Sequence, residues 1–296
     1  MLSERLVDQA EGLRRLMVRA STHVVTVAAA RTGLGATSVV VNLAAALAQA
    51  GKDVLVLDEN LSHDNVANML ALKPRHDLLN AVRRDKSWRE VMLHTHGGVR
   101  VLPAARAIQS LPKLSATERE YLLKCLAEAS QDADVVLVDA AAREGNFFSA
   151  GLASDQPLVL VLNATASAIT ESYAMIKRMA MRDGRRNFEI LVNKARDAGE
   201  AQAVFGNVAQ VARRHLNVRV EYMGYIPLDE KLKRATQLCR PVVEAFPGAP
   251  AALAFAELGR DFLLLPEAGN EGAGWLSDVV QRLVRQAHPQ NMALVT

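Results

Sequence analysis

Residues 24–58 read VVTVAAARTGLGATSVVVNLAAALAQAGKDVLVLD and carry most of the information about the fold. An apolar run of strand length, 24–30, leads into a loop with two glycines, and a helix pattern over 37–50 follows. A second apolar run, 53–58, ends on an acid. A buried strand, a glycine loop and a helix N-terminus can cradle phosphate, because backbone amides and the helix dipole face the anion. The glycines could equally serve only a tight turn, so this pattern alone leaves both interpretations open.

The rest of the chain repeats this alternation of strand and helix patterns. Strand candidates are 99–104, 134–139, 157–162, 188–193 and 218–227, and helix candidates lie near 64–71, 77–93, 115–131, 167–182, 198–216 and 249–264. The helix over 115–131 starts at a capping box, SATE. Strands that are apolar on both faces and alternate with amphipathic helices predict an α/β fold, with a doubly wound, mostly parallel sheet covered on both sides.

The composition along the chain divides it into four expected segments. We expect an amphipathic helix in 1–20, one α/β domain in 21–265, a linker rich in glycine and acid in 266–273, and a second amphipathic helix in 274–288.

The overall composition narrows the class of protein. Of 296 residues, 35 are basic and 32 acidic, and the net charge of +3 argues against direct nucleic-acid binding. Cys125 and Cys239 lie apart, outside any metal-binding spacing, which suits free thiols in a reducing cytoplasm. No run reaches the length of a membrane-spanning helix, and the first residues lack a secretory pattern, so we expect a cytoplasmic protein.

Two strand candidates end on an acid, Asp58 and Asp139. Carboxyl ends of parallel strands meet at one edge of a sheet, beside the loop after the first strand. Together with that loop, the two acids predict a phosphate and magnesium site.

The stretch from the first strand to Asn60 resembles the start of MinD/ParA-type P-loop ATPases, whose Walker A loop reads GKGGxGKT. Gly33, Gly35 and Thr37 match this pattern. The resemblance implies binding of ATP and Mg²⁺. The implied nucleotide contacts are Arg31, Gly33, Gly35, Ala36, Thr37, Ser38 and Asn193, and the implied metal ligands are Thr37, Asp58 and Asp139. The alternative for Asn193 is a strand-end residue that caps the following loop.

The sequence also departs from the family pattern where catalysis would depend on it. Ala30 and Thr32 replace glycines, and Arg31 stands where the family has its signature lysine. Ala36 replaces the lysine that pairs with the β- and γ-phosphates, and Asn60 replaces the second acid of a DxD pair. An amide cannot accept a proton at neutral pH. We therefore expect weak or absent ATP hydrolysis.

Residues 8–14, DQAEGLR, resemble a motif of the flagellar-number regulators FlhG (also FleN or YlxH), which engages the GTPase FlhF. Residues 222–247 are also similar to the end of these regulators. The resemblance implies that the partner contacts are Asp8, Gln9, Ala10, Leu13 and Arg14. The alternative is an amphipathic helix that packs on its own domain.

The terminal helix pattern has an apolar face of Trp275, Leu276, Val279, Val280, Leu283 and Val284. Such a face can lie weakly on the inner membrane surface, or it can dock on the domain or on a dimer partner.

The resemblance favours a regulator of flagellar number or placement that acts on FlhF, and on components of the flagellar switch or transcription machinery. One alternative is an active MinD-like ATPase that cycles between monomer and membrane-bound homodimer. The other is a ParA-like partition protein, which would leave DQAEGLR unexplained.

Overall fold

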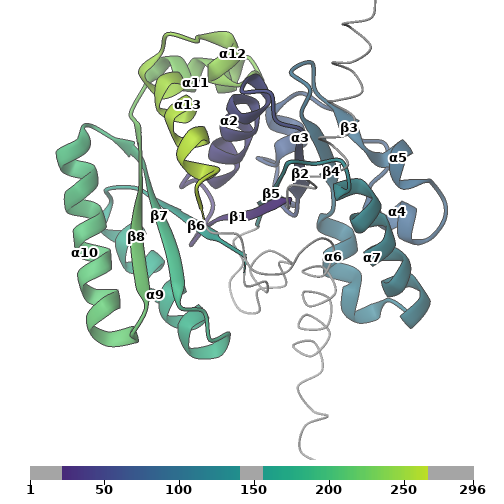
Figure 1. Cartoon of the computed structure of the whole chain (residues 1–296), viewed down its shortest axis with the longest axis horizontal. Helices are drawn as coiled ribbons and strands as arrows, with labels where there is room; N and C mark the ends of the chain where they lie inside the picture. Colours follow the sequence, from purple (N-terminus) through teal and green to yellow (C-terminus); the bar gives the residue numbers. More distant parts are fainter. Residues whose placement is uncertain (1–21, 141–155, 266–296) are drawn as a thin grey trace, which may run out of the picture.

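The computed structural model describes residues 22–140 and 156–265, which form a sheet with helices on both faces (Figure 1). The sheet has eight described strands in the order β3-β4-β2-β5-β1-β6-β7-β8. β3 runs antiparallel to β4, and the other described neighbours are parallel. The strands are β1 (His23–Ala29), β2 (Val54–Asp58), β3 (Leu93–His94), β4 (Arg100–Pro103), β5 (Val135–Asp139), β6 (Leu158–Leu162), β7 (Asn187–Ala195) and β8 (Arg219–Pro227). The predicted doubly wound, mostly parallel sheet is confirmed.

Side chains that alternate along the strands build a core on each face of the sheet. In β1, Val25 and Val27 join the core under one helical layer, and Val24 and Ala28 join the cores under the other. The first layer consists of α2 (Ala36–Gln49), α3 (Val66–Met69), α11 (Glu230–Gln237), α12 (Val242–Ala245) and α13 (Pro250–Phe262). The second consists of α4 (Leu78–Val82), α5 (Trp88–Val91), α6 (Ala105–Ser110), a 3₁₀ turn (Leu111–Lys113), α7 (Ala116–Ser130), α9 (Ala166–Arg182) and α10 (Ala198–Leu216).

The order of the strands determines where a site can form. β1 lies between β5 and β6. The chain segments that connect the strands on the β5 side of β1 and those on its β6 side therefore run in opposite directions along the sheet. In doubly wound folds, the crevice at such a point, beyond the carboxyl ends of the strands, is the usual ligand site. The strand register puts Asp58 of β2 directly beside Asp139 of β5, and Asp139 beside Val27 of β1.

Most predicted elements agree with the structure. Ser115 and Glu118 form the predicted capping box at the start of α7. The single helix predicted over 77–93 is wrong, because the chain forms α4 and α5 instead. Arg84 follows α4 with a φ of 66°, and a new capping box at Ser87 starts α5. The short helices α11 and α12 had no periodic signal long enough to predict them.

Candidate functional site

The loop between β1 and α2 has the backbone shape of an anion-binding loop. Gly33 and Gly35 have φ values of 83° and 99°, in the left-handed region that favours glycine. A Cβ atom on Gly35 would lie 2.2 Å from Nδ2 of Asn193, so this position also needs glycine for space. No described side chain caps the start of α2, and its first turn carries no acid. The first-turn amides therefore point to an anion site at this helix end.

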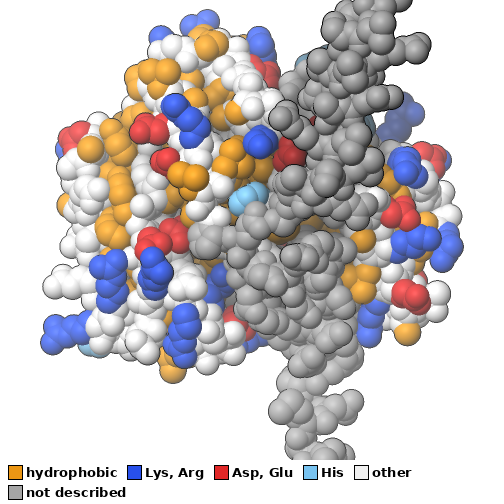
Figure 2. All heavy atoms as spheres, in the orientation of Figure 1, with side chains coloured by type: hydrophobic (Ala, Val, Ile, Leu, Met, Phe, Trp, Pro, Cys, Tyr) orange, Lys and Arg blue, Asp and Glu red, His pale blue; other side chains and the backbone are white. Residues whose placement is uncertain are grey.

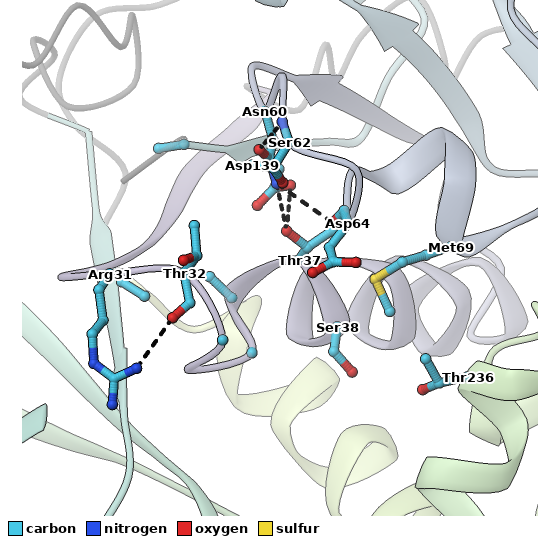
Figure 3. Close-up of a pocket in the computed structure, with 15 residues that line it drawn as sticks. Arg31, Thr32, Thr37, Ser38, Asn60, Ser62, Asp64, Met69, Asp139 and Thr236 are labelled. Atoms are coloured by element: carbon cyan, nitrogen blue, oxygen red, sulfur yellow. Dashed lines mark hydrogen bonds between the residues drawn. The ribbon is translucent and has the colours of Figure 1, made fainter. Parts of the chain in front are cut away.

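A cavity of about 300 Å³ lies beside this loop (Figure 3). The start of α2, the loop after β2, the end of α3, the end of β5 and one residue of α11 complete its wall. The lining residues are Ala29, Arg31, Thr32, Gly33, Gly35, Ala36, Thr37, Ser38, Asn60, Ser62, Asp64, Met69, Asp139, Ala140 and Thr236. Six of the seven predicted nucleotide contacts are among them, the exception being Asn193.

Two buried carboxylates, Asp58 and Asp139, lie side by side on neighbouring strands, and Asp139 lines the cavity whereas Asp58 does not. Burial raises the pKa of Asp139 to about 8, and the negative charge of Asp58 adds to the rise, while a hydrogen bond from Thr37 opposes it. Burial also raises the pKa of Asp58 to about 6, against backbone hydrogen bonds from Asn60 and from the start of α3. A cation nearby would stabilise the charged form of both of these buried carboxylates.

The residues predicted as metal ligands are suited to Mg²⁺. Oγ1 of Thr37 donates to Oδ2 of Asp139 at 2.8 Å, so this hydroxyl and both carboxylates are close together. Hard oxygen ligands of this kind suit Mg²⁺, which typically takes one or two carboxylates and completes its shell with water and phosphate. Within the described ranges, no group of three or more His, Cys, Asp or Glu residues forms an all-protein metal cage.

Asn60 extends the hydrogen-bonded chain of Thr37 and Asp139 (Figure 3). Its side-chain Nδ2 donates to Oγ1 of Thr37 at 3.2 Å, and its backbone nitrogen donates to Oδ1 of Asp58 at 3.1 Å. Its Oδ1 accepts a hydrogen bond from the backbone nitrogen of Ser62 at 2.9 Å. A carboxylate at this position would add a third negative charge beside Asp139, whereas the amide adds none.

Asn193 contacts the loop between β1 and α2 and lies outside the cavity wall. It is 3% exposed, and its Nδ2 donates to the carbonyl of Leu34 at 2.9 Å. The next residue, Lys194, has a φ of 59°, and its Nζ donates to the carbonyl of Gly33 at 3.4 Å. The end of β7 thus holds the loop between β1 and α2, and not the loop that follows β7. An adenine contact by Asn193 and a cap of the following loop both stay predictions.

Several cavity residues were missed by sequence reasoning. Ser62 and Asp64 come from the irregular segment after β2, Met69 ends α3, and Thr236 comes from α11. None of them belongs to a pattern that marks a site, because only the packing of α11 and of the segment after β2 brings them to the loop.

The other predicted sites lie outside the described residues. These are the partner contacts Asp8 to Arg14 and the helix with Trp275 to Val284. Among the helices that the structure describes, none is long and apolar enough to cross a membrane. Over the described surface on the face in Figure 2, basic and acidic side chains are both spread widely.

A parallel sheet, a glycine loop before a helix and two strand-terminal aspartates define a P-loop nucleotide-binding fold. The chain belongs to the MinD/ParA-type P-loop family, and its residues 22–261 match the family model described as cellulose biosynthesis protein BcsQ. It is similar to the antiactivator FleN of Pseudomonas aeruginosa, with 36% identity over 267 residues, which span 90% of this chain and 94% of FleN.

Two further proteins are similar to this chain. The flagellum site-determining protein YlxH of Helicobacter pylori is 23% identical over 217 residues, which span 73% of each chain. The structure of the septum site-determining protein MinD of Pyrococcus horikoshii, complexed with Mg-ADP, matches with a TM-score of 0.63 and 21% identity. That match covers 81% of this chain and 95% of MinD, and it shows the shared fold.

Proposed function

We propose that this chain regulates flagellar number or placement, and that it binds ATP with Mg²⁺ but hydrolyses it weakly or not at all. The similarity to FleN and YlxH supports the flagellar role. One observation carries the nucleotide role: the loop, Thr37 and the two buried aspartates are present, while Ala36 and Asn60 stand where charged catalytic groups would be needed.

In this proposal, the first-turn amides of α2 hold the phosphates, with Ser38 at the cavity wall. Thr37, Asp58 and Asp139 hold the Mg²⁺, which would supply positive charge to the phosphates. Among the described residues that line the cavity, Arg31 is the only cationic side chain. It is therefore the wall's own source of positive charge for bound phosphates.

Calorimetry and a phosphate-release assay test the two halves of this proposal. We expect ATP to bind in the presence of Mg²⁺, with no turnover above background. The double variant Ala36→Lys with Asn60→Asp restores the two missing groups, and we expect it to gain measurable turnover. A robust magnesium-dependent rate in the unmodified protein would contradict weak hydrolysis.

The alternative of an active ATPase, cycling between monomer and membrane-bound homodimer, needs a different base. Asp64 lines the cavity, and its side chain is 87% exposed. If the unmodified protein turns over ATP, and Asp64→Asn abolishes this activity without loss of binding, the active-ATPase interpretation is correct.

The proposed partner is an FlhF-type GTPase, contacted through Asp8, Gln9, Ala10, Leu13 and Arg14. Flagellar switch or transcription components are further proposed partners, together with a second copy of this chain. Stimulation of GTP hydrolysis by the full chain, compared with a chain lacking residues 1–20, tests the first contact. Equal stimulation by both chains would place the contact elsewhere.

We further propose a cytoplasmic protein that touches the inner face of the membrane weakly and reversibly through residues 274–288. Sedimentation with anionic liposomes, using the chain with and without its last 23 residues, tests this contact. Equal pelleting of the two chains would favour a docked terminal helix.

A second candidate function is a role in cellulose biosynthesis, favoured by the description of the matching family model. That match covers 22–261 and therefore does not include the DQAEGLR segment. Deleting the gene separates the two candidates, since changed flagellar number supports the first and lost cellulose supports the second. The ParA-like partition alternative predicts a plasmid or chromosome segregation defect instead.

A further inference from the structure

An ion pair holds Arg31, the one cationic side chain among the described residues of the cavity wall. Nε of Arg31 lies 2.8 Å from Oε2 of Glu171, which belongs to α9. Nη1 of Arg31 also donates to the carbonyl of Thr32 at 3.4 Å. Figure 3 shows the guanidinium pointing away from the group formed by Thr37, Asn60 and Asp139. Arg31 is therefore held away from the place where the proposed phosphates would lie.

This ion pair matters because the loop lacks any other positive side chain. Position 36 is alanine, and the remaining described side chains of the cavity wall are neutral or acidic. Among the described residues of the wall, Arg31 is thus the one cation for a bound polyphosphate, while Lys194, outside the wall, contacts the loop only at the carbonyl of Gly33. Guanidinium has a planar fork of donors that fits a carboxylate and a phosphate equally well, so the two groups compete for it.

We propose that Glu171 is a positioning residue that competes with bound phosphate for Arg31 and so sets the affinity of the cavity for polyphosphates. This inference rests on the nucleotide binding proposed above and adds its regulation. The two side chains are 44% and 40% exposed overall, and Oε2 of Glu171 is itself buried without a hydrogen-bond partner. The contact is therefore an ion pair that lacks hydrogen-bonding geometry, and a phosphate group that hydrogen-bonds Arg31 can displace it. A ligand with more phosphate charge attracts Arg31 more strongly. Removing Glu171 should therefore raise the affinity for triphosphates more than the affinity for diphosphates.

Titration calorimetry on the full chain tests the proposal. The ligands are ATP, ADP and inorganic tripolyphosphate, each with Mg²⁺, and the variant is Glu171→Gln. Because Glu171→Gln removes a half-exposed carboxylate that competes for Arg31, it should lower the dissociation constants of ATP and tripolyphosphate by about two- to fivefold. Tripolyphosphate lacks a base, so a gain with this ligand locates the effect at the phosphates.

A matched control is Glu221→Gln, which removes the same charge from another exposed pair. Nε of Arg219 lies 2.8 Å from Oε1 of Glu221, on the outer strand β8 and outside the cavity wall. This variant should bind all three ligands as the unmodified chain does. Glu171→Ala is a second variant that also removes any contact of a glutamine with Arg31, and thermal melting checks that each variant folds.

A double-mutant cycle separates competition for Arg31 from a general change of charge. Arg31→Ala should weaken binding, and adding Glu171→Gln to it should then bring no gain. Two results would overturn this inference and leave the proposed nucleotide binding intact. One is an equal gain in affinity from Glu171→Gln in the Arg31→Ala background. The other is no gain in affinity from either Glu171 variant in a chain that binds ATP. If neither the unmodified chain nor any variant binds the three ligands, the proposed nucleotide binding fails, and the inference fails with it.

Discussion

Replacing Asp139 by Asn should stabilise the metal-free protein at neutral pH. Burial and the charge of Asp58 raise the pKa of Asp139 from 3.8 to about 8 in the folded protein. The folded state therefore binds a proton that the unfolded state has lost, and stability falls as pH rises from about 4 to about 8. Below this window both states are protonated, and the effect disappears.

The size of this free-energy cost follows from the difference between pH 7 and the pKa of Asp139 in the unfolded state. Each pH unit corresponds to about 1.4 kcal/mol, so the cost to the folded state at pH 7 is at most about 4 kcal/mol. Asparagine avoids this cost, and its side-chain oxygen can still accept the hydrogen bond from Thr37. We expect a gain of about 2–4 kcal/mol, or about 4–15 °C in the melting temperature of a domain of this size.

Urea unfolding at pH 5 and pH 8, with EDTA present, measures this effect. The difference between Asp139→Asn and the unmodified chain should grow with pH. Asp132→Asn, an exposed acid in the same turn before β5, should change stability little at either pH. Equal or lower stability of Asp139→Asn at pH 8 would refute the argument from the buried charge.

Three further predictions concern the loop and the N-terminal segment. Ala36→Lys should tighten ATP binding by about tenfold or more in calorimetry, because a charged hydrogen bond to phosphate is restored. Gly35→Ala should cost about 2–4 kcal/mol in urea unfolding, because the new Cβ would lie 2.2 Å from Nδ2 of Asn193 at a φ of 99°. Gln9→Ala should remove most stimulation of an FlhF-type GTPase, as measured by GTP hydrolysis, because the amide that positions water is lost.

Each of these three has a comparison that can contradict it. Unchanged ATP affinity in Ala36→Lys would mean that the phosphates lie elsewhere. Gly33→Ala meets no atom within 4 Å, so it should cost less than Gly35→Ala, and equal losses would refute the clash with Asn193. If Gln9→Ala stimulates normally while the domain melts earlier, residue 9 is structural.

Much of the fold could be predicted from the sequence because its signals are local. Strands such as 134–139 are apolar on both faces, and α10 was predicted over its full length from its periodicity. The glycine loop and the aspartates that end two strands likewise predicted that these groups meet at one edge of the sheet, as the structure shows. These signals need only neighbours along the chain, since parallel strands bring their carboxyl ends to one edge.

The tertiary structure decided the contacts between segments that are distant in sequence. The pairing of Arg31 with Glu171 and the support of Leu34 by Asn193 join positions more than 130 residues apart, and no periodicity marks them. The raised pKa of Asp139 likewise depends on burial and on a neighbouring strand. Composition determines which groups are present, whereas the packing of β2, β5, β7 and α9 around one loop determines which of them meet and how strongly each is charged.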